Sequence, residues 1–202
     1  GYSAGQTIQR ANAIAIGPNA GYSNQSAESI AIGNGTGSSN QGTQAIAMGY
    51  LCAQSNQGDN SIAMGYQAGD NNQEENAIAI GVSSGLTTQS NSAIAIGYNS
   101  GFSNQGSSAI SIGTNAGKSN QYSNAIAIGL EAGKESQSNG AIALGATSGQ
   151  ISQRTNAIAI GISAGYSNQG ERSVAIGEAS GQNGQSNDSI AIGNSAGNSN
   201  QN

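Results

Sequence analysis

The sequence predicts an all-β protein, a parallel β-solenoid built from 16-residue coils. The phrase Ala-Ile-Ala-Ile-Gly begins at Ala13 and returns in closely similar form every 16 residues along the chain. A fixed period of this size is typical of solenoids, in which each repeat forms one coil that stacks on its neighbours. We number the positions of one repeat from 1 to 16, with position 1 at Ala13. Thirteen full or partial copies cover the sequence, so we expect about 13 coils.

The first element of each coil is a short strand over positions 1 to 4, as at residues 13–16. Small and large apolar residues alternate there with the period of two that a strand requires. Glycine occupies position 5 in all 13 copies, from Gly1 to Gly193. We expect this glycine to end the strand, where the backbone bends sharply or φ becomes positive.

A second short strand completes the coil, and the sequence leaves two places for it. It covers positions 7 to 9, as at residues 19–21, or positions 10 to 13, as at residues 22–25. Position 9 is glycine in every copy except Ala53, which marks another corner. The polar phrase Ser23-Asn24-Gln25 is typical of turns, and asparagine tolerates a left-handed backbone. Neighbouring coils should then pair in parallel, about 4.8 Å apart.

Because the period is constant, equivalent side chains should lie above one another in ladders. Position 2 predicts an aliphatic ladder and position 5 predicts a glycine ladder. Position 13 is always glutamine, and it predicts a ladder of amides that hydrogen-bond along the axis. These ladders give each fixed residue a structural role that needs no chemistry. Their representatives are Ile14, Ile30, Ile78, Ile94 and Ile158; Gly17, Gly33, Gly81 and Gly161; and Gln25, Gln41, Gln57, Gln105 and Gln169.

The first strand is apolar on both faces, which predicts that both faces are covered. The simplest arrangement places the isoleucines of positions 2 and 4 inside the coil and leaves an exposed alanine strip outside. An apolar strip of that length usually marks an interface, so we expect lateral association through it. The opposite arrangement, with alanine inside and isoleucine outside, would make lateral association more necessary still, because isoleucine exposes more apolar surface. The candidate interface residues are Ala15, Ala31, Ala47, Ala79, Ala95 and Ala159.

The repeated phrase resembles the head repeats of trimeric autotransporter adhesins, the YadA-like heads. Those repeats carry a Ser-Val-Ala-Ile-Gly phrase, which residues 173–177 match directly, and residues 76–81 show the related form with a preceding asparagine. The resemblance implies a left-handed parallel β-roll, association of three chains side by side, and binding to extracellular matrix or cells. The period of 16 residues is longer than is usual in that family, and the additional residues fall in the Ser-Asn-Gln region.

Composition excludes several classes of function. The chain has no histidine, so it cannot contain a histidine-based catalytic triad. Charged residues make up 7% of the chain, the net charge is −5, and no basic patch exists for nucleic acid. No stretch approaches the roughly 20 apolar residues of a membrane span. We therefore expect no enzymatic activity, no cofactor, no metal and no nucleic acid partner.

A few single residues have a functional and a structural interpretation. Cys52, the only cysteine, is a reactive thiol or a small residue in a small site, and we favour the second. Glu74 and Glu75, near Asp59 and Asp70, form a weak cation site or a solvated acidic patch, and again we favour the second. The surface tyrosines contact glycans or cells, or stack on one another, as we expect for Tyr50 and its neighbour at position 6, 16 residues later.

Three functions remain, all of them extracellular or at a cell or virion surface. The first is a self-assembling structural fibre, in which the unpaired edges of the end coils also invite end-to-end stacking. The second is a trimeric adhesin head that binds matrix or cell surfaces. The third is an ice-binding solenoid, for which position 11, as at Thr7, Ser23 and Asn71, is polar but irregular. Residues 1–202 are expected to form one continuous array, a window on a longer repeat protein.

Overall fold

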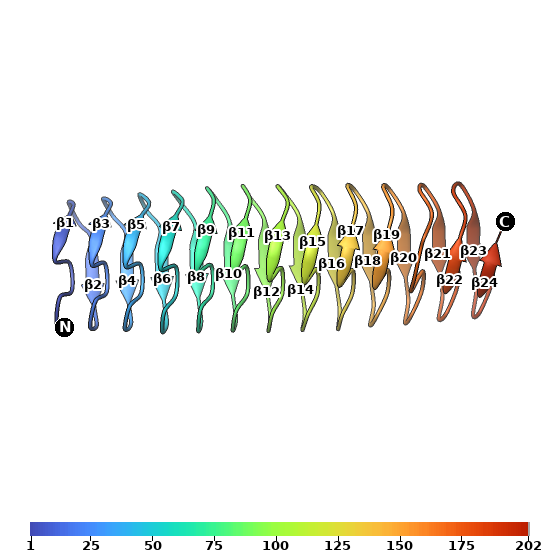
Figure 1. Cartoon of the computed structure of the whole chain (residues 1–202), viewed down its shortest axis with the longest axis horizontal. Helices are drawn as coiled ribbons and strands as arrows, with labels where there is room; N and C mark the ends of the chain where they lie inside the picture. The colour runs from blue at the N-terminus through green and yellow to red at the C-terminus, as the bar shows by residue number, and fades with distance from the viewer. Residues whose placement is uncertain (202) are drawn as a thin grey trace. The chain divides into compact units, whose positions relative to one another are not determined.

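The computed structural model describes residues 1–201, and it describes side chains as far as residue 199. The secondary structure of these residues consists of short strands joined by turns. Among the residues described, no helix is long and apolar enough to cross a membrane. The predicted all-β class is therefore confirmed (Figure 1).

The strands fall into two compact units, residues 1–103 and the remainder from residue 104. Each strand has three residues, and β13 (Ser103–Gln105) spans the boundary. The strands of the first unit are β1 (Thr7–Gln9), β2 (Ile14–Ile16), β3 (Ser23–Gln25), β4 (Ile30–Ile32), β5 (Ser39–Gln41), β6 (Ile46–Met48), β7 (Ser55–Gln57), β8 (Ile62–Met64), β9 (Asn71–Gln73), β10 (Ile78–Ile80), β11 (Thr87–Gln89) and β12 (Ile94–Ile96). Those of the second unit are β14 (Ile110–Ile112), β15 (Ser119–Gln121), β16 (Ile126–Ile128), β17 (Glu135–Gln137), β18 (Ile142–Leu144), β19 (Ile151–Gln153), β20 (Ile158–Ile160), β21 (Val174–Ile176), β22 (Asn183–Gln185), β23 (Ile190–Ile192) and β24 (Ser199–Gln201).

The pairing between coils follows the 16-residue period. In the first unit, Ile78 pairs with Ile94 and Gln9 with Gln25, both in parallel. In the second unit, β18 pairs with β20 in the same way. Twelve strands over positions 2 to 4 are present in the described residues. This is one fewer than the 13 copies in the sequence, because the sequence starts at position 5 and its first copy lacks these positions.

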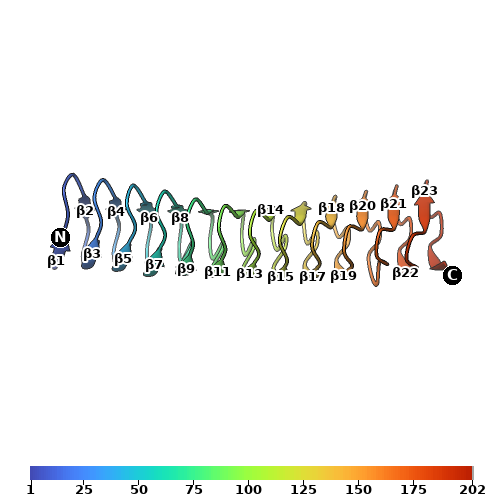
Figure 2. The same cartoon turned by 90° about the horizontal axis from the view of Figure 1, so that it is seen from above.

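Each coil contributes one strand to each of two layers, and the second strand occupies positions 11 to 13. The Ser-Asn-Gln phrase is therefore a strand, whereas positions 6 to 9 form a turn. Within each unit, the strands of the first type, over positions 2 to 4, lie on one side. The strands of the second type, over positions 11 to 13, lie on the opposite side (Figure 2). From Ser167 the second layer continues through isolated bridges to Ile151 and Asn183 instead of a full strand.

Left-handed backbone at fixed positions closes the coil. At position 5, Gly17 has a φ of 126°, and an added Cβ atom would lie 2.5 Å from the carbonyl oxygen of Gly33 on the next coil. Only glycine fits such a site. Position 12 is the centre of the second strand, and Asn56 has a φ of 55° there. Asparagine recurs at position 12 because it adopts this conformation at lower cost than most residues.

The interior of the coil is lined by alanine and glutamine, which corrects the predicted arrangement. Ala79 is fully buried, whereas Ile80, the next residue along β10, is 36% exposed. The alanines at 31, 47, 79, 95 and 159 are all fully buried and Ala15 is half-buried, so they form no exposed strip. The physical reason is that the interior is too narrow for isoleucine. Even a single Cβ atom added to the facing Gly85 would lie 3.2 Å from the Cβ of Ala79.

Candidate functional site

The main candidate site is an aliphatic face on the strands of the first type. Because alanine points inward at position 3, the side chains of positions 2 and 4 point outward from the coil. We call them the aliphatic face. In the first unit it consists of Ile14, Ile16, Ile30, Ile32, Ile46, Met48, Ile62, Met64, Ile78, Ile80, Ile94 and Ile96. In the second unit it consists of Ile110, Ile112, Ile126, Ile128, Ile142, Leu144, Ile158, Ile160, Val174, Ile176, Ile190 and Ile192.

The aliphatic face is large and carries no charge. Met64 is 38% exposed and Leu144 is 42% exposed, although each has aliphatic neighbours on the adjacent coils. Two such side chains per coil make a continuous apolar strip along each unit. A strip of this kind usually marks a surface that another protein covers. The structure therefore moves the candidate interface from the alanines to the isoleucines, which sequence reasoning had placed inside the coil.

The glutamines of position 13 connect the two strands of the coil. The amide nitrogen of Gln137 donates to the carbonyl oxygen of Ile126 at 2.7 Å and lies 3.2 Å from that of Ala141. Gln25, Gln41, Gln57 and Gln169 make the same contact to position 2. These hydrogen bonds satisfy carbonyl groups that would otherwise be buried without partners.

The same glutamines also form ladders along the axis. In the second unit, the amide of Gln137 donates to the Oε1 atom of Gln153 at 3.1 Å, and that of Gln105 donates to Gln121 at 3.2 Å. In the first unit, the amide of Gln57 donates to Gln73 at 3.3 Å. The Oε1 atoms of Gln25, Gln41, Gln57 and Gln185 have no partner, so the axial ladder is interrupted at the first coils and again at Gln185. The contact across the coil is the more regular of the two and was not expected from the sequence.

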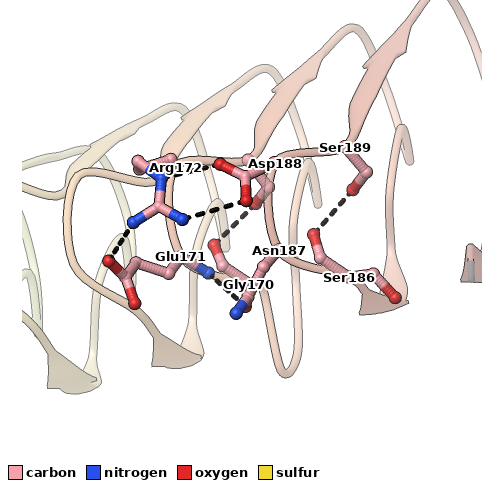
Figure 3. A network of polar contacts seen from close by, with 8 residues as sticks. Gly170, Glu171, Arg172, Ser186, Asn187, Asp188 and Ser189 are labelled. Carbon is pink, nitrogen blue, oxygen red and sulfur yellow. Dashed lines mark hydrogen bonds and ion pairs between the residues drawn. The ribbon is translucent and has the colours of Figure 1, made fainter.

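Charged side chains form small surface pairs. Arg172 donates to both carboxylate oxygens of Asp188 on the next coil, at 2.6 and 2.9 Å, and also contacts Glu171 (Figure 3). This arrangement lowers the pKa of Asp188, chiefly through the hydrogen bond from Arg172. The pair is exposed, so solvent screens it and it adds little to the stability of the fold. Among residues 1–199, no group of three acidic, cysteine or histidine side chains is placed to hold a metal ion.

Two buried groups have shifted pKa values. Burial raises the pKa of the Cys52 thiol to about 12, and its sulfur lies 3.1 Å from the carbonyl oxygen of Ala63. Burial also raises the pKa of Asp70, an effect that hydrogen bonds from the backbone of Gln54 and the side chain of Asn71 partly offset. A thiol of such high pKa is protonated at neutral pH, so Cys52 is a small interior residue and no nucleophile.

Tyr50 and Tyr66 both lie at position 6, just after the first strand of their coils. The rings of Tyr50 and Tyr66 stack with their centroids 5.8 Å apart, and both remain more than 40% exposed. Stacking between adjacent coils, which the shared position 6 predicts, is therefore confirmed for this pair.

Comparison with known proteins supports the resemblance noted in the sequence. The family model described as the YadA head domain repeat matches the chain in two copies, at residues 57–68. That short segment contains Gln57, the whole of β8 and Gly65. No curated protein sequence matches the chain significantly. The parallel solenoid agrees with the fold that the resemblance implies, so the chain carries YadA-like head repeats.

Proposed function

We propose that this chain is an adhesin-like head segment that associates side by side with copies of itself. In this proposal the aliphatic face is the contact between copies, and the remaining surface is free to meet a ligand at the cell surface or in the extracellular matrix. The role is structural and adhesive, without catalysis.

The observation that carries the proposal is the aliphatic face together with the family match. Heads of the YadA family are trimeric, and an association of several copies would bury the aliphatic strip of each one at a shared axis. Burial of apolar surface stabilises an assembly by roughly 25 cal/mol per Å² removed from water. The Arg172 network and the acidic residues lie outside this strip, so they would not be buried by the contact.

A structural fibre remains the second candidate, and it shares the same lateral contact. The matched family favours the head, because the family is one of adhesins. The two functions differ in what they require along the axis, since a fibre needs end-to-end stacking and a head does not. An ice-binding surface has less support, because position 11 includes Ile151 and Glu135 as well as the polar residues noted above.

The first test is the mass of the purified chain in solution, measured by analytical ultracentrifugation. We expect a discrete homo-oligomer, and the double variant Ile112→Lys/Leu144→Lys should be monomeric because it places two charges on the aliphatic face. The control Ile162→Lys replaces a residue that is 57% exposed on the turn, outside the face, and should leave the oligomer intact. A monomeric wild-type chain would contradict the proposal, and open-ended polymers would favour the fibre.

A second test addresses adhesion. The chain displayed on an inert bacterium should increase attachment to matrix-coated plates or cultured cells, whereas the monomeric double variant should attach less because it loses multivalency. Attachment equal to that of the undecorated bacterium would argue against the adhesive part of the proposal. Thermal hysteresis in the same preparation would instead favour the ice-binding alternative.

A further inference from the structure

A second surface of the coil, on the strands of the other type, contains a polar groove. In the first unit the groove has a volume of about 600 Å³ beside Asn56, Asn72, Gly58 and Glu74. It follows positions 12 to 15, whereas the aliphatic face occupies positions 2 and 4 on the opposite layer of the coil. The groove therefore stays open when copies associate through the aliphatic face.

One wall of the groove is a ladder of asparagine side chains at position 12. The amide nitrogen of Asn24 donates to Asn40 at 3.1 Å, that of Asn40 to Asn56 at 3.0 Å, and that of Asn56 to Asn72 at 2.9 Å. Each amide has two N–H donors and two acceptor positions on its oxygen, and the ladder uses one of each. The exposed asparagines thus offer a second donor and a second acceptor to a ligand at each of these coils.

Gly58 at position 14 also lines the groove, and the next coil leaves no room for a side chain there. A Cβ atom there would lie 2.5 Å from the backbone carbon of Glu74. Glu74 and Glu75 line the groove as well, and Glu74 accepts a hydrogen bond of 3.0 Å from the backbone N–H of Asn91. No lysine or arginine lines this part of the groove, so it does not favour an anion.

The same groove recurs along positions 12 to 15 elsewhere in both units. In the first unit a smaller hollow lies beside Asn24 and Gly42, with Arg10 at its edge, and in the second unit others lie beside Asn120 and beside Asn168, the latter with Arg154. At Asn120 the neighbouring Tyr122 is 55% exposed, and its ring offers an apolar surface next to the amides. A site that repeats with the coil suits a linear ligand whose own units repeat.

We propose that this groove binds neutral oligosaccharides, with the position-12 asparagines and Glu74 as the contacting side chains. Carboxylates accept hydrogen bonds only, whereas amides both donate and accept. A ligand that satisfies both must carry groups that donate and accept from nearly the same point, and sugar hydroxyls do so. A peptide fits less well, because extended peptides are recognised through pockets for alternate side chains, which a groove lined by amides, glycine and carboxylates does not provide.

The proposal deepens the adhesive function, on which it rests for its biological setting, by naming the chemical class of the ligand. The binding itself needs no association, since the groove near Asn56 lies within one chain. The experiment can therefore separate the two ideas. If the monomeric variant Ile112→Lys/Leu144→Lys binds sugar, the groove is supported independently of the oligomer.

The test is titration of the full chain with cellohexaose, chitohexaose and mannohexaose, followed by calorimetry and by ligand-observed NMR. We expect at least one of these neutral hexasaccharides to bind. In the variant Asn56→Ser/Asn72→Ser the groove beside these two residues should bind about tenfold more weakly, because two amide contacts are removed, and the number of sugars bound per chain in calorimetry should fall. Serine occurs naturally at position 12, at Ser136 and Ser152, so the variant should fold, and its melting curve by circular dichroism checks this.

The matched control is Asn19→Ser/Asn99→Ser, which makes the same changes at position 7. Serine occurs there too, at Ser83 and Ser163, and the backbone is also left-handed, so sugar affinity should be unchanged. Three results would overturn the proposal: no binding of any of the three sugars, unchanged affinity and unchanged stoichiometry in Asn56→Ser/Asn72→Ser, or displacement of the sugar by an unrelated extended peptide.

Discussion

The hydroxyl of Ser111 donates a hydrogen bond of 2.6 Å to the Oε1 atom of Gln121 inside the coil. Ser111 is the one exception to alanine at position 3, and both side chains are buried. The Oε1 atom of Gln121 also lies 3.2 Å from the amide of Gln105. The interior thus accepts a polar side chain at position 3 because the glutamine opposite supplies an acceptor.

This arrangement predicts unequal effects for the two partners. Ser111→Ala should change the free energy of unfolding by less than about 1 kcal/mol, because Gln121 keeps its other partners and alanine fills this position in other coils. Gln121→Ala should destabilise the protein by about 2–4 kcal/mol, since it leaves buried carbonyl groups unpaired and opens a cavity. Urea unfolding followed by circular dichroism measures both.

The control for this pair is Gln182→Ala, which truncates a half-buried glutamine at position 10 and should cost much less than Gln121→Ala. Equal losses for the two glutamines would show that the interior amides do not hold the coil together.

The 16-residue period predicted most of the fold but did not predict which residues form the candidate interface. Constant spacing fixed the parallel register and the stacking of Tyr50 on Tyr66, because both follow from arithmetic on the repeat. It did not decide which face of the first strand is inside, since Ala79 and Ile80 are both apolar and alternation alone gives two equivalent solutions. The size of the interior decides between them. An added Cβ atom on Gly85 would already lie 3.2 Å from the Cβ of Ala79, and no local pattern reveals how narrow this space is.

The sequence did not decide which positions form the second strand, for a related reason. Asparagine, serine and glutamine are typical of turns, yet Ser55–Gln57 forms a strand. Its central residue, Asn56, keeps the left-handed backbone expected of a turn. Pairing with adjacent coils overrides local preference at the two flanking residues, and this tertiary effect is absent from a single repeat.

Glycine at position 5 should tolerate no side chain. Gly145→Ala would place a Cβ atom 2.8 Å from the carbonyl oxygen of Gly161 at a φ of 124°, so we expect a loss of roughly 3 kcal/mol or more. The comparison is Ala53→Gly at position 9, where the natural alanine has a φ of 49° and its removal should have a small effect. Thermal unfolding of both variants tests this, and a Gly145→Ala variant as stable as wild type would refute the clash.

Asp70 should make the fold less stable as pH rises. Burial raises its pKa in the folded state, so the folded protein binds the proton more tightly than the unfolded chain does. Between the ordinary aspartate pKa and the raised one, the folded state holds more protons, and stability falls as pH increases through that range. Below it both states are protonated and the penalty is absent.

The variant Asp70→Asn removes this titration. It should raise the melting temperature by a few degrees at pH 7 and have little effect at pH 3, as measured by calorimetry at both values. The exposed Asp59→Asn, whose native carboxylate accepts the backbone N–H of Thr43 at 2.7 Å, serves as a control and should not be stabilising at pH 7. A stabilisation by Asp70→Asn that is equal at both pH values would point to packing rather than charge.

Cys52 should be inert while the protein is folded. Its thiol is fully buried, and with a pKa of about 12 almost none of it is thiolate at pH 8, the form that attacks disulfide reagents. Ellman's reagent should therefore react with the chain only after denaturation, releasing one equivalent of chromophore. Cys52→Ala should change the free energy of unfolding by less than about 1 kcal/mol, because Ala68 and Ala116 fill the same position in other coils. Rapid reaction of the native protein would instead assign this cysteine the exposed, cross-linking role that its burial argues against.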